Sequence, residues 1–231
     1  MAAAAVVQSA PLLGDAQGLL GTAGQFGASI ADAAASLLVS QQRCPNAGRK
    51  LRFKKAEEVS SDSGMVKWEE YRVKLREAIE TRSISCSRAL EERGWQFDAG
   101  ISMLCGLDTT VIAATSDGKS FTYQILSIVN QGSSLLGVFP LTSLQNDQVR
   151  SCQALGIKAC ALNSKAMEND SQLLDRAAGG EYEAVFVTPE FIRADNSKFI
   201  KLLGFSGKRC SAFRKRLMAV VIDESHLVFH W

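Results

Sequence analysis

A possible phosphate-binding tripeptide, Gly118-Lys119-Ser120, follows an apolar run at residues 109–114 and precedes a helical stretch at residues 121–131. A glycine turn between a buried strand and a helix presents backbone N–H groups to phosphate oxygens. In such a loop the lysine contacts the β- and γ-phosphates and the serine hydroxyl binds Mg²⁺. The same tripeptide also occurs in ordinary surface turns, so the prediction rests on its position between an apolar strand and a helix. We expect a nucleotide loop made of Thr115, Ser116, Asp117, Gly118, Lys119 and Ser120.

A second motif, the acidic pair Asp223-Glu224, follows the apolar run at residues 218–222. A carboxylate at the end of a buried strand can hold Mg²⁺, and an adjacent glutamate can accept a proton from an attacking water. A polar turn after an edge strand is the ordinary alternative. Because the two motifs follow strands of one predicted sheet, we interpret them as one site, with Ser120 and Asp223 as the Mg²⁺ ligands.

Zinc is disfavoured. His226 and His230 stand four apart, but a zinc protease helix has Glu directly after the first His, where this chain has Leu227. The six cysteines are scattered and form no CxxC pair. This pattern favours reduced thiols inside a cell over a disulfide scaffold.

Short apolar runs alternate with helical stretches after residue 85, which predicts an α/β fold. Continuous apolar strands separated by helices form a mainly parallel sheet that is covered on both faces. Ligands bind at the carboxyl ends of such strands. The candidate strands are residues 109–114, 135–139, 159–162, 184–187 and 218–222.

Composition changes along the chain predict four segments. The first is weakly helical and low in complexity, the second is basic and polar, and the third is an amphipathic helix with apolar residues three and four apart. The fourth is the α/β domain. Their bounds are residues 1–48, 49–64, 65–84 and 85–231.

The overall composition excludes few functions. The chain has 231 residues, 46% of them hydrophobic, with a net charge of +2, so nucleic-acid binding must be argued from local sites. No Lys or Arg occurs before Arg43, which argues against a signal peptide. No apolar run approaches the roughly 18 residues of a membrane span. We therefore expect an intracellular protein with no membrane partner.

The motifs together resemble the RecQ branch of the superfamily 2 DNA helicases. Asp223-Glu224-Ser225-His226 is similar to the DExH box, and residues 113–124 are similar to helicase motif I with its trailing Leu-Cys-Tyr-Gln. Further blocks resemble motifs of the family and follow one another in the same order along the chain. The last of them resembles the start of the aromatic-rich loop. They are residues 139–144, 147–149, 161–164, 187–190 and 227–231.

The resemblance implies a RecA-like P-loop NTPase domain that binds ATP, Mg²⁺ and DNA, with roles in DNA repair and recombination and a place in the nucleus. It makes Glu224 the base, assigns catalytic roles to Lys119, Asp223 and His226, and places the adenine-reading Gln at Gln96, 23 positions before Lys119. Contacts to the nucleic-acid backbone, with little sequence specificity, are implied for Thr142, Ser143, Gln148, Asn163, Thr188 and Trp231.

The sequence also departs from the family pattern. Ser116 stands where a Gly is usual, Ser225 replaces Ala, and the aromatic residue expected shortly before Gln96 is missing, although Trp95 could stack instead. A loop that wraps phosphate depends on Gly for close approach, so Ser116 predicts weaker nucleotide binding.

The sequence stops at Trp231, before motif III and the second lobe. In related NTPases an arginine contributed from outside the nucleotide loop is worth roughly 10³- to 10⁵-fold in rate. The chain is therefore expected to need a second lobe for unwinding. The alternative is a truncated, inactive module that binds DNA or protein without hydrolysis. A third interpretation, an unrelated P-loop kinase or GTPase, accounts for fewer of the sequence motifs. An incomplete sheet leaves an exposed edge strand, which predicts self-association. The partner of the tail at residues 1–48 is unknown.

Overall fold

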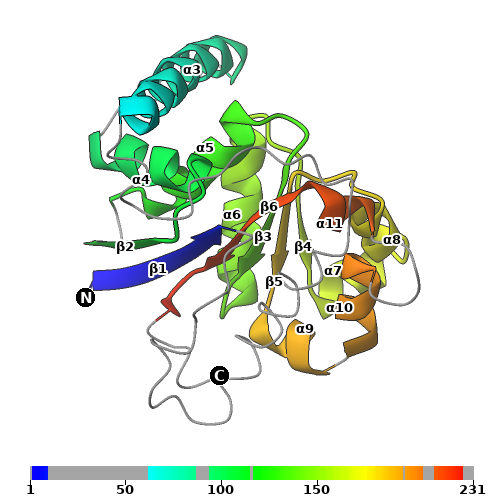
Figure 1. Ribbon diagram of the computed structural model, residues 1–231. Coiled ribbons are helices and arrows are strands. Elements are labelled where there is room, and N and C mark those ends of the chain that lie inside the picture. Colours follow the sequence, from blue (N-terminus) through cyan, green and yellow to red (C-terminus); the bar gives the residue numbers. More distant parts are fainter. Residues whose placement is uncertain are drawn as a thin grey trace.

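A computed structural model describes residues 2–9, 62–86, 94–114, 117–194, 196–204 and 211–225. Within them, six strands form one sheet in the order β2-β1-β6-β3-β5-β4, with helices on both sides (Figure 1). The strands are β1 (Ala2–Ser9), β2 (Thr109–Ala114), β3 (Ser134–Val138), β4 (Ala159–Leu162), β5 (Ala184–Val187) and β6 (Leu217–Ile222). The helices are α3 (Asp62–Cys86), α4 (Gly94–Leu104), α5 (Lys119–Val129), α6 (Thr142–Ala154), α7 (Ser164–Asn169), α8 (Leu173–Ala178), α9 (Pro189–Ala194), α10 (Asn196–Leu203) and α11 (Ala212–Arg216).

The predicted α/β fold is confirmed. Strands β6, β3, β5 and β4 are parallel neighbours. Each of the five strand predictions coincides with a strand or differs from it by one residue at one or both ends. The helix after the nucleotide loop begins two residues earlier than predicted, at Lys119.

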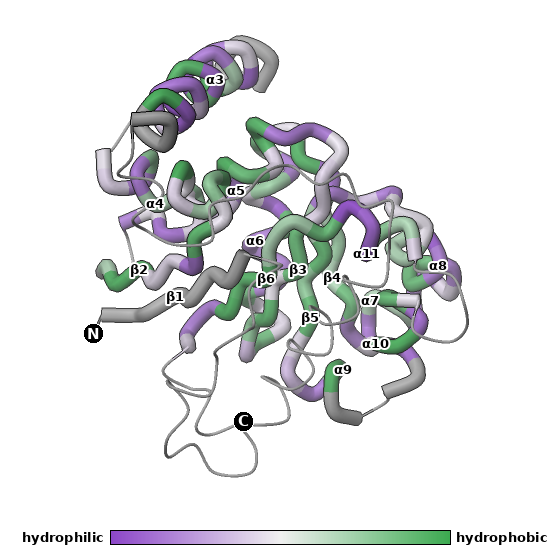
Figure 2. The backbone as a smooth tube through the Cα atoms, viewed as in Figure 1, coloured by the Kyte–Doolittle hydropathy of each residue, from purple (hydrophilic) through white to green (hydrophobic). Residues whose placement is uncertain are grey.

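Strands β3, β4, β5 and β6 are apolar because they are buried on both faces of the sheet. Successive residues of a strand point to opposite faces. Leu135 belongs to a hydrophobic cluster that contains residues of α3, α4, α5 and α6, whereas Leu136 belongs to a second cluster that contains residues of α8, α9, α10 and α11. Figure 2 shows hydrophobic strands enclosed by helices of mixed polarity. The continuous apolar runs of the sequence therefore reflect two hydrophobic clusters rather than one.

Helix α3 packs on α4 and α5, as its periodicity predicts (Figure 1). Leu75 and Ile79 are buried in the core, and Trp68, Tyr71 and Ala78 pack against it. Val66 and Val73 lie on the opposite, exposed face. The helix is longer than the predicted 65–84 segment by a few residues at either end.

The weak helical character predicted for the tail is wrong for residues 2–9. This segment is strand β1, which pairs antiparallel with β2 on one side and with β6 on the other. Alanine has the highest helix propensity of all residues, but propensity is a weak preference, and hydrogen bonds to two neighbouring strands override it. Residues 10–48, the basic run at 49–55 and the linker up to residue 61 lie outside the described residues, whereas residues 62–64 of the predicted linker belong to α3.

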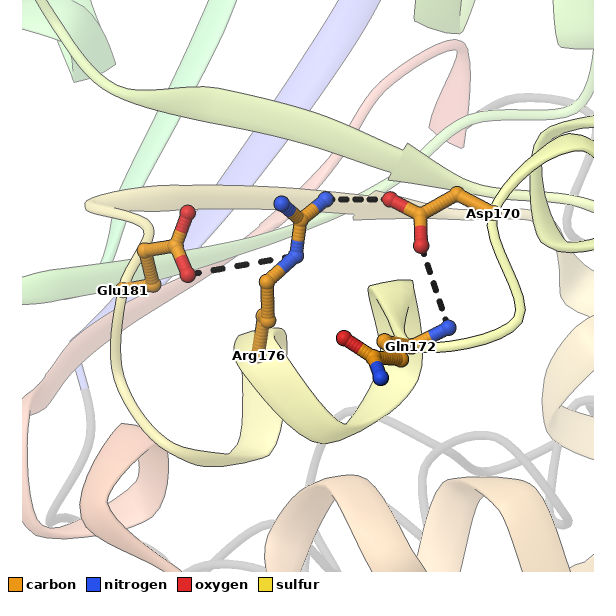
Figure 3. A network of polar contacts seen from close by, with 4 residues as sticks. All are labelled: Asp170, Gln172, Arg176 and Glu181. Atoms are coloured by element: carbon orange, nitrogen blue, oxygen red, sulfur yellow. Dashed lines mark hydrogen bonds and ion pairs between the residues drawn. The ribbon is translucent and has the colours of Figure 1, made fainter.

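The amino ends of the parallel strands carry a polar surface of their own. Arg176 of α8 pairs with Asp170 and lies 3.9 Å from Glu181 Oε2, while Asp170 also accepts from the backbone of Gln172 (Figure 3). A pocket of about 700 Å³ lies at the same edge. It is lined by Thr81, Arg82, Gln131, Gly132, Leu155, Gly156, Lys158, Gly180, Glu181, Glu183 and Arg216, none of which is a predicted site residue.

Candidate functional site

The loops that carry the predicted site residues lie at one edge of the sheet. Strands β2 and β6 both run antiparallel to β1 and therefore run in the same direction as each other. The nucleotide loop follows β2, and Asp223 follows β6. The segments after β3, β4 and β5 leave the sheet at the same edge. The motifs thus meet where a parallel sheet binds ligands.

Gly118 shapes the turn into α5. Its φ of 74° is left-handed, and helix α5 begins at Lys119 without a side-chain cap. Such a conformation favours glycine, and an uncapped helix start leaves N–H groups for an anion. A Cβ on Gly118 would lie 2.7 Å from Nε2 of Gln96. Glycine is therefore required here by both the backbone angle and the close approach.

Gln96 braces this turn. The side chain is 5% exposed, and its Nε2 donates to the carbonyl oxygens of Asp117 and Gly118 at 3.0 Å each. Both N–H groups of the amide are thereby directed at the loop, which leaves Oε1 as the atom able to accept a further hydrogen bond. The structure thus places Gln96 against the nucleotide loop, and its contact with adenine stays a prediction.

Lys119 turns its side chain back into the loop. The ammonium donates to the carbonyl oxygen of Ala113 at 3.1 Å, and the residue is 8% exposed. Burying a lysine is costly unless its charge finds hydrogen-bond partners. The carbonyl of the preceding strand thus keeps this ammonium where an anion entering the loop would meet it.

Asp223 and Glu224 form a tight turn directly after β6. The backbone N–H of Asp223 donates to the carbonyl oxygen of Val138 at 3.0 Å, so the turn is anchored to the end of β3. Glu224 has a φ of 50°, and no other described non-glycine residue has a positive φ. Left-handed backbone costs an L-residue about 1–2 kcal/mol, and such strain gathers at functional sites.

Tyr123 brings Ser120 and Asp223 into one neighbourhood. Burial raises the pKa of the Tyr123 hydroxyl well above its usual value, and the carboxylate of Asp223 raises it further, whereas the nearby Ser120 side chain lowers it. A hydroxyl and a carboxylate are oxygen donors of the kind that Mg²⁺ prefers. The donor set at the nucleotide loop therefore fits Mg²⁺.

The start of α6 presents polar groups to solvent. Leu141, Thr142 and Ser143 are exposed, and the helix has no side-chain cap. Gln148, one turn further along α6, is half-buried and accepts a hydrogen bond from the Tyr123 hydroxyl at 2.7 Å. Thr142 and Ser143 are therefore accessible to a ligand, whereas Gln148 links α6 to the helix of the nucleotide loop.

Asn163 and Thr188 are helix caps in this structure. Asn163 Oδ1 accepts from the backbone of Ala166 at 3.0 Å, and Thr188 Oγ1 accepts from the backbone of Phe191 at 3.1 Å. The amide of Asn163 also donates to Gln145 Oε1 at 3.2 Å. These bonds account for both polar side chains without a ligand, and their contacts with nucleic acid stay predictions.

Four predicted site residues lie outside the described part of the chain. They are Thr115, Ser116, His226 and Trp231.

Three site features were missed by the sequence reasoning. They are the buried Gln145 that ties Asn163 to α6, the left-handed backbone at Glu224, and the Tyr123 hydroxyl. A glutamine on the buried face of a helical pattern would have indicated the first. No sequence signal indicates a positive φ at a glutamate.

The described residues contain neither a candidate membrane-spanning helix nor a candidate metal-binding cluster. No helix there is long and apolar enough to cross a membrane. No group of three or more His, Cys, Asp or Glu side chains in that part of the chain is arranged to hold a metal ion.

Comparisons with known proteins agree with this geometry. The model of the DEAD/DEAH box helicase family matches residues 96–231, more than half of the chain. The match begins at Gln96 and includes the nucleotide loop and the Asp223–His226 box. The part of the chain that forms the site is thus the part that the family model covers.

Among individual proteins, the chain is similar to ATP-dependent DNA helicases named RecQ. It is 33% identical to the one from Haemophilus influenzae over 129 residues, which are 55% of this chain and 19% of that protein. It is 31% identical to RecQ of Bacillus subtilis over 54% of this chain and 19% of that protein. The ATP-dependent helicase SGS1 of Saccharomyces cerevisiae is 31% identical over 59% of this chain and 9% of its own length.

The chain thus spans about a fifth or less of the length of these relatives. The matched region carries the nucleotide loop and the acidic box on one edge of a parallel sheet. On these grounds the chain belongs to the DEAD/DEAH box helicase family, and its α/β domain is a RecQ-like helicase lobe.

Proposed function

We propose that this chain is the ATP- and nucleic-acid-binding lobe of a RecQ-like DNA helicase, in which hydrolysis drives unwinding together with a second lobe. One observation carries the nucleotide assignment: Gln96 and Lys119 both point their nitrogens into the turn that starts α5, at the same edge of the sheet as Asp223. The membership of the family supports the same assignment.

In this proposal each residue of the turn has one task. The Lys119 ammonium leaves the carbonyl of Ala113 and pairs with the β- and γ-phosphates of ATP. The Ser120 hydroxyl and the Asp223 carboxylate hold Mg²⁺, which neutralises charge developing on the phosphates. Glu224 accepts the proton of the attacking water. His226 connects the acidic box to the loops that contact nucleic acid.

Gln96 has two tasks in this proposal. Its amide nitrogen keeps the loop in shape, and Oε1 is the atom left to accept a hydrogen bond from the exocyclic amino group of adenine. The brace and the base contact would then be made by one side chain. Binding of adenine would in this way favour the loop conformation that holds the phosphates.

The nucleic-acid face is proposed at the exposed start of α6. Thr142 and Ser143 offer hydroxyls, and the uncapped helix start offers N–H groups, to the phosphates of a single strand. Gln148, Asn163, Thr188 and Trp231 complete the proposed face. Such contacts fix the position of a strand without reading its sequence, so DNA of any sequence is the expected partner. Roles in DNA repair and recombination, and a nuclear location, follow from the resemblance alone.

A second candidate function rests on Ser116. The residue replaces the usual glycine of the nucleotide loop, and a side chain there opposes the close approach of phosphate. The chain would then bind DNA or protein without hydrolysis. Nucleotide affinity separates the two candidates.

The deciding experiment is an equilibrium titration of the chain with Mg²⁺–ATP by calorimetry. Saturable binding that Lys119→Ala abolishes supports the nucleotide site. The matched control is Lys158→Ala, which removes an exposed lysine from the opposite edge of the sheet and is expected to leave ATP affinity unchanged. Absence of binding in a wild-type chain with cooperative thermal unfolding would refute the nucleotide assignment and favour the binding module.

A further inference from the structure

The Tyr123 hydroxyl lies between the nucleotide loop and helix α6. Its side chain is 1% exposed and projects from α5, three residues after Ser120. The hydroxyl donates to Oε1 of Gln148 at 2.7 Å, so a hydrogen bond joins α5 to α6. A buried hydroxyl on the helix that begins at the nucleotide loop therefore contacts a residue of the proposed nucleic-acid face.

Aromatic packing fixes the position of this hydroxyl. The Tyr123 ring meets Phe139 edge-on with centroids 6.5 Å apart, and Phe139 meets Phe186 in the same manner at 5.2 Å. All three rings are buried, and close-packed rings do not change rotamer without opening a void. The Tyr123 hydroxyl therefore moves with α5 rather than independently of it.

Phe139 extends this contact to the nucleic-acid face. It is the residue that follows β3, and only Pro140 and Leu141 separate it from the start of α6 at Thr142. A displacement of α5 thus reaches α6 by two routes, the hydrogen bond to Gln148 and the ring contact with Phe139. Both routes pass through the side chain of Tyr123.

We propose that Tyr123 is a positioning residue that couples nucleotide binding to nucleic-acid binding in this lobe. The inference rests on the proposed function. Nucleotide bound at the start of α5 shifts this helix, and the hydrogen bond from Tyr123 to Gln148 and the ring contact with Phe139 transmit the shift to α6. Binding at one site then alters the position of α6 at the other. By linkage, nucleic acid must change nucleotide affinity by the same factor.

Tyr123→Phe tests this coupling because it removes only the hydroxyl and keeps the ring. The affinity of a labelled oligothymidylate of about 16 nucleotides is measured by fluorescence anisotropy, with and without a saturating non-hydrolysable ATP analogue and Mg²⁺. The ratio of the two dissociation constants is the coupling factor. The wild type is expected to show a factor of about five or more. Tyr123→Phe is expected to bring it within about twofold of one, with each separate affinity changed less than about threefold.

Controls separate coupling from stability. Tyr182→Phe removes a tyrosine hydroxyl at the far edge of the sheet and is expected to keep the wild-type factor. A double variant with Gln148→Met is expected to lose no more coupling than Tyr123→Phe alone. A purely structural role for Tyr123 would lower the melting temperature and leave the factor intact, which would overturn the proposal.

The remaining outcomes are also decisive. A wild-type factor of one in a chain that binds both ligands would overturn the coupling while leaving the proposed function standing. Failure of the wild-type chain to bind ATP or oligonucleotide would instead refute the proposed function itself. The two failures are thus distinguished by the single-ligand titrations.

Discussion

The side-chain nitrogen of Gln96 lies 3.0 Å from the carbonyl oxygen of Gly118, and a Cβ on Gly118 would lie 2.7 Å from that nitrogen. Helix α4 thus contacts the nucleotide loop through a single amide that is also bonded to Asp117. The loop is shaped from outside itself, by a residue that precedes Gly118 by 22 positions.

Gln96→Glu is expected to distort the loop and weaken ATP binding. The substitution is isosteric, but it replaces a donor to two carbonyl oxygens with a buried acceptor that repels them. Leaving such groups unsatisfied costs about 1–3 kcal/mol each, so we expect a loss of about 2 kcal/mol or more in the free energy of unfolding and at least tenfold in ATP affinity. Urea denaturation and calorimetry measure both. The exposed Gln172→Glu is the control, with an expected change under about 0.5 kcal/mol.

Replacing Glu224 by Gly or by Ala separates its backbone from its side chain. Both variants lose the carboxylate and are expected to lose the proposed hydrolysis equally. Only Gly accepts the φ of 50° without strain. Glu224→Gly is therefore expected to unfold at a higher urea concentration than Glu224→Ala, with a difference of about 1 kcal/mol. Equal stability of the two variants would contradict a left-handed turn at this position.

Much of the fold could be predicted because the strands are buried on both faces. The run from Ala184 to Val187 is apolar throughout, since alternate residues contact two different clusters. A four-residue run of this kind has few alternative interpretations once helices flank it. Strand β1 was not predictable, because its partners β2 and β6 lie over a hundred residues away in the sequence and its alanines favour helix.

The site was predictable in its residue types and not in its contacts. Motif spacing placed Lys119 and Asp223 after two strands of one sheet, and β2 and β6 do end at the same edge of that sheet, with β1 between them. Spacing says nothing about which partner a polar side chain selects. It therefore could not show that Gln96 donates to the loop, that Thr188 caps α9, or that Tyr123 joins α5 to Gln148.

Thr188 provides a test of capping against ligand contact. Its hydroxyl accepts from the backbone of Phe191, and loss of a helix cap costs about 0.5–2 kcal/mol. Thr188→Val is expected to lower the free energy of unfolding by that amount. Thr188→Ser keeps the hydroxyl and is expected to retain most of the wild-type stability. If Thr188→Val weakens oligonucleotide binding but leaves urea denaturation unchanged, the cap is not its main role.

The buried cysteines predict a loss of stability at high pH. Burial raises the pKa of Cys105 to about 11 and those of Cys152 and Cys160 to about 12, from 9.0. Above pH 9.0 the unfolded thiols ionise while the native ones stay neutral. Their contribution to stability is therefore complete below pH 9.0 and falls as the pH rises toward 11 and 12.

Urea denaturation across this pH range measures the effect. Lysine and tyrosine side chains also titrate there, so the slope of the wild type is compared with that of Cys160→Ala. The variant is expected to be less stable at pH 7, because it leaves a cavity, and to show a shallower decline above pH 9. Rapid alkylation of Cys105, Cys152 or Cys160 in the native chain near neutral pH would contradict their burial.

Gly137 makes room for the rings that surround Tyr123. A Cβ at this position of β3 would lie 2.5 Å from Cδ1 of Phe186 and 2.6 Å from Cε2 of Phe139. Gly137→Ala is therefore expected to lower the free energy of unfolding by about 1–3 kcal/mol and, because Phe139 holds Tyr123, to reduce the coupling factor. Gly94→Ala is the matched control, since nothing lies within 4 Å of its added methyl. A second substitution, Phe186→Leu, frees space beside residue 137 and is expected to recover part of the loss in Gly137→Ala, although alone it destabilises the wild type. Additive effects in the double variant would show that these residues do not compete for the same space.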